Sequence, residues 1–364
     1  MRVRSLRARP VLVPLKRPPV SASGGIPAAA LVLIDLETDG GITGRSYVFA
    51  FASWAFGPVV GCLQAMLEMI KGDALAPLEI EAKLRARLTL LDTPGLVGLA
   101  LAGIDMAAWD ALAQAHRVPL VTLLGGALKP IAAYNSTGLW LKPVDTLADE
   151  AEALLAEGFR AVKLRLGRDD AAQDLAAVRA VKARIGERVT LMCDFNQRLT
   201  VNEAILRGRA LDGEGLYWIE EPVRHDDYEG YARIAADVKT PIQTGENLVD
   251  TFEMARAIAA RSLDYVMPDV QRIGGVTGWL RAACAGPRAR HRDVEPPLPR
   301  VQRPPARRDA DVSLARVHGL GRARAPRAAA GQGRARPDPR PAGRGDRLER
   351  RRRAALRGVS PGVA

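Results

Sequence analysis

The sequence of 364 residues contains only three cysteines, and they lie far apart. Cys62, Cys193 and Cys284 provide no disulfide framework, and their spacing does not match the paired cysteines of a metal site. We therefore expect a protein of a reducing compartment, the cytoplasm. The beginning of the chain has no apolar run typical of a signal peptide, and no stretch approaches the roughly 20 apolar residues of a membrane span. The sequence thus predicts neither secretion nor membrane insertion.

Net positive charge is missing from most of the chain. The formal net charge of the whole chain is +12, but residues 285–364 contain 21 Arg, no Lys and 7 acidic residues. The first 284 residues hold 32 basic and 34 acidic groups, so they are nearly neutral. We therefore predict no specific binding of nucleic acid by this first part. A natural basic arm that binds nucleic acid is an alternative for the tail alone.

The same tail also lacks the residues that build a core. Residues 285–364 contain no Ile, Phe, Tyr, Trp, Met, Lys, Asn or Thr, and they are rich in Arg, Pro, Ala and Gly. Such a segment cannot bury enough apolar surface to offset its chain entropy. We predict that it is disordered.

The remaining sequence is 284 residues long, enough for one large domain and a smaller one. Residues 1–130 have the pattern of an α+β unit, in which Asp39-Gly40-Gly41 is a strong hairpin signal. The predicted strands are Val3–Leu15, Ala30–Thr38 and Gly41–Phe49, and the clearest predicted helix is Ala100–Ala115.

Between residues 131 and 284, short strand-like runs alternate with amphipathic helices. The six strand-like runs are AAYNSTGL, AVKLRLG, TLMCDFNQ, LYWIEEPV, PIQTGEN and LDYVMPDVQ. The helices between them include Asp149–Glu157, Asp174–Ile185 and Asp250–Ala260. A repeat of about 25–30 residues is what a (β/α)₈ barrel requires. We predict an α/β fold whose barrel is incomplete, with about six units.

Three acidic residues follow successive predicted strands at matched spacing. Asp194, Glu220 and Glu246 are 26 residues apart in each step, one β/α unit. They should project from the C-terminal ends of the strands, where barrel active sites form. Three converging carboxylates repel one another unless a cation neutralises them, and an all-oxygen site suits Mg²⁺. The alternative is that each is a solvated loop acid.

Two cations and a further acid extend this candidate site. Lys163 and Arg165 alternate on the strand AVKLRLG, so both side chains point to one side, the barrel interior or its mouth. Two cations buried there need anionic partners, although both could instead extend to solvent. Asp269 ends the sixth strand and could orient a neighbouring base, although an Asp after Pro is as often a turn former.

Several segments resemble the mandelate racemase / muconate lactonizing enzyme type of the enolase superfamily, and mandelate racemase in particular. They are LVLIDL, AGIDMAAWDAL, PLVTLLGG, GFRAVK, WIEEP, HDDYEG and MPDVQRIGGVTGW, and they run through most of residues 1–284. The resemblance implies an enolase-type barrel in residues 131–284 with an N-terminal α+β capping domain in residues 1–130. It also implies that the loop Ser21–Pro27 closes over the substrate.

The resemblance further assigns roles to individual residues. It implies that the Mg²⁺ ligands are Asp194, Glu220 and Glu246. Lys163 matches the first Lys of the family's Lys-x-Lys strand, which contacts the substrate carboxylate. Asn196 matches a polar residue near the metal and the substrate, and Asp269 matches the Asp of a catalytic His–Asp dyad.

The implied reaction is abstraction of the proton α to the carboxylate of a hydroxy acid through a metal-stabilised enediolate. The chain departs from the family pattern at two places. The second Lys of the strand, one of the racemase's two opposed bases, is Arg165, and a guanidinium is a poor base. The expected His after Asp269 is also missing, since His291 and His318 lie in the Arg- and Pro-rich tail.

The tail has the composition of GC-rich codons, which favours an out-of-frame translation. Reading one nucleotide later permits IAMSSHLFPE over His291–Arg300, followed by FSAHLLAATPT, WLEYMDW and GVGIVWN. These resemble the family's seventh strand with its His, its eighth-strand region with an active-site Glu, and its C-terminal stretch. We therefore hypothesise that a frameshift separates residues 1–284 from the last barrel units.

The function predicted from the sequence is that of a Mg²⁺-dependent racemase or dehydratase of mandelate racemase type, acting on a small-molecule hydroxy carboxylate. Arg165 favours a one-base reaction, such as dehydration of an acid sugar. The alternatives are a catalytically dead remnant and, less favoured, a nucleic-acid-binding protein. Intact relatives of this family are expected to be homo-oligomers.

Overall fold

The computed structural model describes residues 1–285, except residues 22–23 and 92. The predicted disorder of the tail and the out-of-frame strands fall on residues outside the described part of the chain. They therefore stay predictions, as do the domain boundaries at residues 130 and 284.

The N-terminal part is an antiparallel sheet covered by helices. Its three-stranded sheet has the order β1-β4-β5, where β1 is Val3–Pro14, β4 is Ala28–Thr38 and β5 is Thr43–Phe49. A small hairpin joins β2 (Val20–Ser21) to β3 (Gly24–Gly25). The helices are η1 (Ser53–Ala55), α1 (Phe56–Ile70), α2 (Pro77–Arg87), α3 (Leu96–His116) and α4 (Leu120–Leu123). The three predicted strands and the predicted helix are confirmed to within a few residues at each end.

Local chemistry explains the turn between β4 and β5. Gly41 has φ of 75°, a left-handed conformation that glycine adopts without steric cost, and its N–H donates to the carbonyl of Thr38. Alternate residues of β4 are buried in one cluster with α1 and α3, namely Val32, Ile34 and Leu36. Gly103 of α3 allows this packing, because a Cβ there would collide with Ile34.

By length and composition alone, two helical segments could cross a membrane, Ser53–Ile70 and Leu96–His116. This corrects the expectation that no stretch approaches that length. The reason is that alanines and glycines between the larger side chains raise the mean hydropathy without forming a continuous run of large apolar residues, and the helices contain few charges, Glu68 in one and Asp105 and Asp110 in the other. In Leu96–His116, 67% of the apolar window is buried inside the protein, as in the core helix of a soluble protein, so the evidence for a span is weak.

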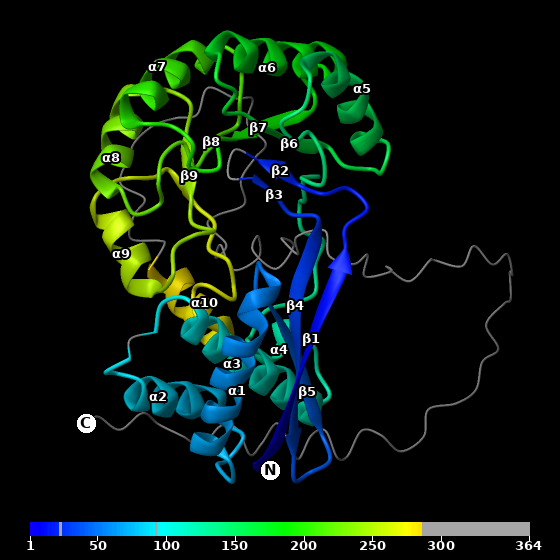
Figure 1. Cartoon of the computed structure of the whole chain (residues 1–364), viewed down its shortest axis with the longest axis vertical. Coiled ribbons are helices and arrows are strands. Elements are labelled where there is room, and N and C mark those ends of the chain that lie inside the picture. The colour runs from blue at the N-terminus through cyan, green and yellow to red at the C-terminus, as the bar shows by residue number, and fades with distance from the viewer. Residues whose placement is uncertain (22–23, 92, 286–364) are drawn as a thin grey trace, which may run out of the picture. The chain divides into compact units, whose positions relative to one another are not determined.

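The second part alternates helices and parallel strands (Figure 1). Its strands are β6 (Ala161–Arg165), β7 (Thr190–Asp194), β8 (Ile219–Glu220), β9 (Ile242–Thr244) and β10 (Tyr265–Val266). Its helices are α5 (Val144–Leu155), α6 (Ala171–Ile185), α7 (Val201–Leu211), α8 (Tyr228–Asp237), α9 (Thr251–Ala259) and α10 (Gly275–Ala285). The strand order β10-β9-β8-β7-β6 places each strand beside the next along the chain, as in the predicted (β/α) barrel.

The first of the six predicted barrel strands is shorter than expected. Its run AAYNSTGL contributes one parallel bridge, between Asn135 and Val162, instead of a full strand. After the bridge, Oδ1 of Asn135 accepts the backbone N–H of Thr137 in a local turn, and Leu139 then accepts from the backbone N–H of Arg165 without forming a ladder. In the described part of the chain the sheet ends at β10 on its other edge, which agrees with an incomplete barrel.

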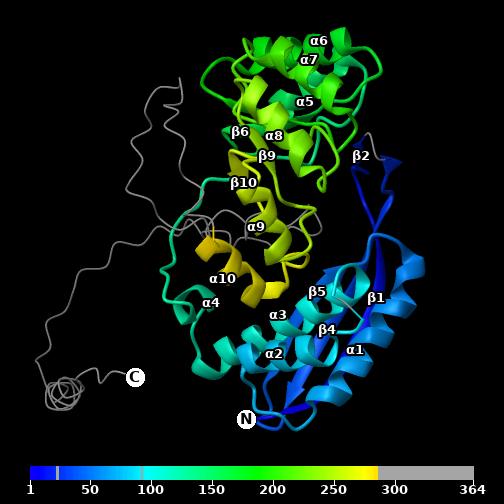
Figure 2. The ribbon, with the colours of Figure 1, turned by 90° about the vertical axis from the view of Figure 1, so that its left-hand side faces the viewer.

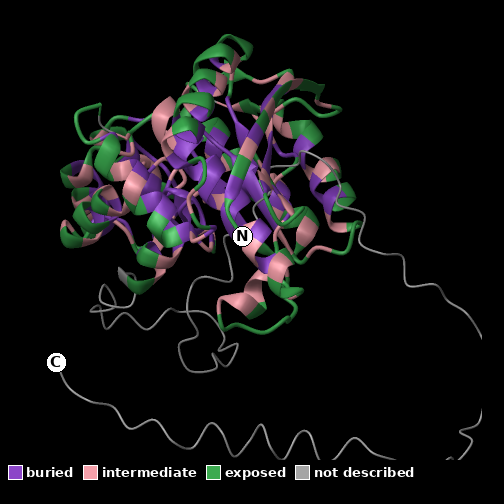
Figure 3. Ribbon diagram, turned by 90° about the horizontal axis from the view of Figure 1, so that it is seen from below, coloured by how far each residue is buried: buried purple, intermediate pink, exposed green. Residues whose placement is uncertain are grey.

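The helices α5 to α9 lie on the outer side of the parallel sheet (Figures 1 and 2). Side chains that point outward from the strands, such as Val162, Leu164 and Leu191, form a core cluster with these helices. Figure 3 shows the buried residues on the inner faces of the elements and the exposed residues on the outer faces of the helices. The alternate strand residues point to the other side of the sheet, where the candidate site lies.

Candidate metal centre

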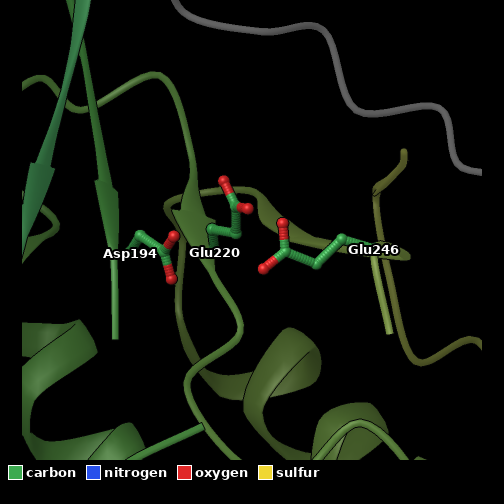
Figure 4. Close-up of side chains that lie close together, drawn as sticks. All are labelled: Asp194, Glu220 and Glu246. Carbon is green, nitrogen blue, oxygen red and sulfur yellow. The ribbon is translucent and has the colours of Figure 1, made fainter. Parts of the chain in front are cut away.

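The three predicted acids come together at the C-terminal ends of the strands. Asp194 is the last residue of β7, Glu220 is the last residue of β8, and Glu246 follows β9 by two residues. One carboxylate oxygen from each lies within 4.8 Å of the other two. Asp194 and Glu220 are fully buried, and Glu246 is partly exposed. Figure 4 shows the three side chains reaching from three successive segments toward one another.

Strand register explains why these residues meet. In the parallel ladder, Arg165 pairs with Asp194, and Asp194 pairs with Glu220. After β9 the chain bends at Gly245, whose φ is 142° and whose hypothetical Cβ would lie 2.7 Å from the backbone N of Met267. Only glycine fits this close approach, which brings Glu246 next to the ends of β7 and β8.

The two predicted cations are buried beside the carboxylates, so the alternative of solvent-exposed side chains is wrong. The Nζ of Lys163 lies 2.8 Å from Oδ2 of Asp194 and 2.8 Å from Oε2 of Glu220. The Nε of Arg165 lies 3.9 Å from Oδ2 of Asp194. The Arg165 guanidinium also stacks over the ring of Trp140 at 4.1 Å and donates to the carbonyl of Ser136.

The composition of the cluster fits a hard divalent cation. Three carboxylates carry three negative charges, and Lys163 and Arg165 carry two positive ones, which leaves one negative charge in a buried site. The donors are all oxygens, the atoms that Mg²⁺ prefers. With Mg–O distances of about 2.1 Å, oxygens around one ion lie at most roughly 4.2 Å apart, which is comparable to the 4.8 Å within which the three carboxylate oxygens lie. With Mg²⁺ and one substrate carboxylate bound, the total charge would be zero.

Of the other two predicted residues, Asn196 lies beside the three carboxylates and Asp269 lies outside their cluster. The backbone N–H of Asn196 donates to Oδ1 of Asp194 at 2.8 Å, so Asn196 lies directly beside the cluster. Asp269 is outside the cluster of three carboxylates. Its Oδ1 accepts from the backbone N–H groups of Gln271 at 2.8 Å and Arg272 at 3.1 Å, which is the behaviour of a turn former.

Residues that the sequence analysis missed surround the carboxylates. Glu221 is 1% exposed and lies next to Glu220 in the chain. Burial raises its pKa well above the ordinary value, and the nearby Glu246 and Asp194 raise it further. The segment WIEEP shows that a second acid follows Glu220, but strand spacing could not show that this second acid is also buried. The strand pattern gave no indication that Trp140 stacks on Arg165.

Two family models match the chain. The model "Mandelate racemase / muconate lactonizing enzyme, N-terminal domain" matches residues 3–125. The model "Enolase C-terminal domain-like" matches residues 146–295, and so extends past Cys284, where the resemblance was expected to end.

By their names, several curated relatives are enzymes that act on sugar acids or their derivatives, and another is an L-Ala-D/L-Glu epimerase. The chain is 34% identical over 271 residues to 3,6-anhydro-alpha-L-galactonate cycloisomerase of Streptomyces coelicolor, covering 72% of this chain and 73% of the relative. It is 35% identical over 188 residues to L-talarate/galactarate dehydratase of Salmonella typhimurium. That match covers 51% of this chain and 47% of the relative, so the chain spans about half of that enzyme's length.

Solved structures agree with the fold and contain magnesium. An enolase from alpha proteobacterium bal199 with bound magnesium has 46% identity and a TM-score of 0.77, covering 79% of this chain and 80% of its own. An enolase from Bradyrhizobium complexed with magnesium and mandelic acid has 41% identity and a TM-score of 0.75, with 79% and 80% covered. L-Talarate dehydratase from Polaromonas, complexed with magnesium and L-glucarate, has 31% identity and a TM-score of 0.72, with 79% and 78% covered.

Proposed function

Because the chain belongs to the mandelate racemase / muconate lactonizing enzyme family of the enolase superfamily, we propose that its site abstracts the proton α to the carboxylate of a hydroxy acid with the help of Mg²⁺. Relatives in this superfamily are dehydratases, cycloisomerases and racemases. Within this range we propose a one-base reaction, the dehydration of a sugar acid, in which the proton is accepted by the histidine that the family resemblance places after Asp269 and that the out-of-frame reading would supply. The observation that carries this choice is Arg165, buried where the family resemblance places the second base.

Arg165 is unsuited to proton abstraction for two reasons. A guanidinium stays protonated at any ordinary pH, so it has no lone pair to accept a proton. Its contacts with Trp140, Ser136 and Asp194 also hold it as a fixed cation. Racemisation needs a base on each face of the α carbon, whereas elimination of water needs one base and an acid. A fixed cation on one face is therefore compatible with dehydration.

Each remaining residue has a proposed task. Asp194, Glu220 and Glu246 would hold Mg²⁺, which when bound neutralises negative charge on the substrate carboxylate. Lys163 adds positive charge beside that carboxylate from its position between Asp194 and Glu220. Asn196 holds Asp194 in place through its backbone N–H. The charge balance of the site fits a single substrate carboxylate, which favours a monocarboxylate.

The experiment compares three reactions in the purified full chain. Mandelate and a panel of sugar monoacids are incubated with Mg²⁺ in D₂O, and α-proton exchange, racemisation and keto-acid formation are followed by NMR and polarimetry. We expect the frame-corrected chain, which carries the histidine base, to dehydrate at least one sugar acid without racemising mandelate. Arg165→Lys is the matched variant, since it restores a titratable amine at the same position. Racemisation by the unmodified chain would overturn the one-base proposal.

An inactive remnant is the second candidate, and one observation favours it. The described residues include two histidines, and neither is the base that the family pattern requires. His116 ends α3, and the His225 ring contacts Gln197. If the base lies in the out-of-frame reading, the chain as translated binds Mg²⁺ but shows no α-proton exchange, and a frame-corrected chain restores exchange. The cytoplasmic location, the homo-oligomer and the absence of specific nucleic-acid binding stay predictions.

A further inference from the structure

A second layer of polar side chains lies behind the three carboxylates. Glu221 follows Glu220 directly, Asn247 follows Glu246 directly, and Gln197 comes three residues after Asp194. The Nδ2 of Asn247 donates to both carboxylate oxygens of Glu221, at 2.8 Å and 2.9 Å. The Nε2 of Gln197 lies 3.5 Å from Oε2 of Glu221. One buried carboxylate thus connects the loops that follow β7, β8 and β9.

The backbone of these loops is held in an unfavourable conformation. Asn196, Gln197 and Glu221 have φ values of 45°, 66° and 42°, in the left-handed region that side-chain-bearing residues rarely adopt. The backbone N–H of Gln197 donates to the carbonyl of Glu221 at 2.7 Å, which ties two of the strained positions together. Such conformations persist only where surrounding contacts determine them, and they cluster at functional sites.

Gln197 makes a second contact with the loop that follows β8, at His225. Its Oε1 accepts from the backbone N–H of His225 at 3.0 Å and contacts the ring Nδ1 of His225 at 3.1 Å. The amide therefore uses its oxygen toward His225 and its nitrogen toward Glu221. Replacing it by an apolar side chain would remove both of its side-chain contacts with the loop after β8.

We propose that Gln197, Glu221 and Asn247 form a positioning network that sets the spacing of Asp194, Glu220 and Glu246, and thereby the affinity for Mg²⁺. This inference rests on the metal site of the proposed function. Outer hydrogen-bond partners of metal ligands commonly change metal affinity by about 10–100-fold when they are removed. None of the three network residues needs to contact the ion itself.

The test measures metal binding directly, without a substrate. Isothermal titration calorimetry of the metal-free full chain gives the Kd for Mg²⁺, and thermal unfolding in EDTA gives the stability of the same proteins. We expect Asn247→Ala and Gln197→Ala each to raise the Kd about tenfold or more. The matched controls are Asn202→Ala and Gln173→Ala, which remove the same groups from exposed helix positions. These controls should leave the Kd unchanged.

A double variant separates a network from two independent effects. Because both amides act on Glu221, the combined Asn247→Ala and Gln197→Ala variant should lose less affinity than the product of the two single losses. Variants that unfold earlier in EDTA but keep the wild-type Kd would overturn the inference and leave the metal site standing. Fully multiplicative losses would also contradict a shared network. If the unmodified chain bound no Mg²⁺, the metal site and the network's role would fail together.

Discussion

Asp105 is a buried carboxylate that joins helix α3 to the N-terminal end of helix α10. Its Oδ2 accepts from the backbone N–H of Thr277 at 3.0 Å, and its Oδ1 accepts from the Thr277 hydroxyl. Trp109 donates to the same hydroxyl through Nε1 at 2.9 Å. Gly275 leaves room for the contact, since a Cβ there would collide with the Asp105 carboxylate. Asp105 therefore caps α10 from another helix, and its ionisation should affect stability.

The contribution of Asp105 to the free energy of unfolding follows from its pKa. Burial raises the pKa of Asp105 from 3.8 to about 6, and the hydrogen bonds from Thr277 offset only part of that effect. The nearby Glu81, which pairs with Arg85 and Arg281, also raises the pKa. Since one pH unit corresponds to 1.36 kcal/mol, the ionised carboxylate costs the folded state about 3 kcal/mol relative to the protonated form. The protonated form makes its full contribution to the free energy of unfolding only below about pH 4. This contribution is lost as the pH rises through about 6.

The perturbation is Asp105→Asn, which keeps the size of the side chain and removes its titration. The free energy of unfolding is measured with urea at several pH values for the wild type and the variant, using tryptophan fluorescence. We expect the wild type to gain about 2.4 kcal/mol over the variant between pH 7.5 and pH 4, because the unfolded carboxyl is itself partly protonated at pH 4. Titrating groups that do not interact with Asp105 cancel in this difference. A difference that stays constant within about 0.5 kcal/mol across this range would refute the reasoning.

Three further predictions concern the carboxylate cluster and one concerns the tail. Lys163→Met leaves buried carboxylates without their cation, so the metal-free chain should lose about 3–5 kcal/mol in urea unfolding, and Mg²⁺ should restore part of it. Gly245→Ala places a methyl group against the backbone of Met267, so calorimetry should show a weaker Mg²⁺ affinity as Glu246 shifts; unchanged affinity would contradict the proposed bend. Mg²⁺ at about 100 times its Kd should stabilise the wild type by about 2.7 kcal/mol, and EDTA should abolish this gain in a thermal scan. Sequencing of the gene should show that the codons after about Ala283 encode IAMSSHLFPE in the next frame; any other reading there ends the frameshift hypothesis.

The carboxylate cluster could be predicted because it depends on periodic features. Asp194, Glu220 and Glu246 each follow a strand-like run, and the carboxyl ends of neighbouring parallel strands lie at one edge of a sheet. The alternation of Lys163 and Arg165 likewise predicts a shared side, which the structure shows as the buried interior. These relations need only strand spacing and the two-residue period of a strand.

The role of Asp269 could not be decided from strand spacing. Spacing placed it at the end of the sixth strand but could not show whether it also closes a turn, and its expected pairing with a catalytic His stays a prediction. In the structure its Oδ1 accepts the backbone N–H groups of Gln271 and Arg272. The choice depends on local backbone angles and on neighbouring segments, which no pattern of residue types determines.

The sequence by itself determined the family, through the resemblance of its segments. It also determined the alternation of strands and helices and the identity of the three clustered acids, because these follow from spacing along the chain. Only the tertiary structure decided that Lys163 contacts two of those acids, that Glu221 connects three loops through Gln197 and Asn247, and that Asp105 caps a helix from a distant part of the chain. These contacts join residues far apart in sequence or depend on left-handed backbone positions. Their energies arise from burial and from distances between side chains, and both exist only once the chain has folded.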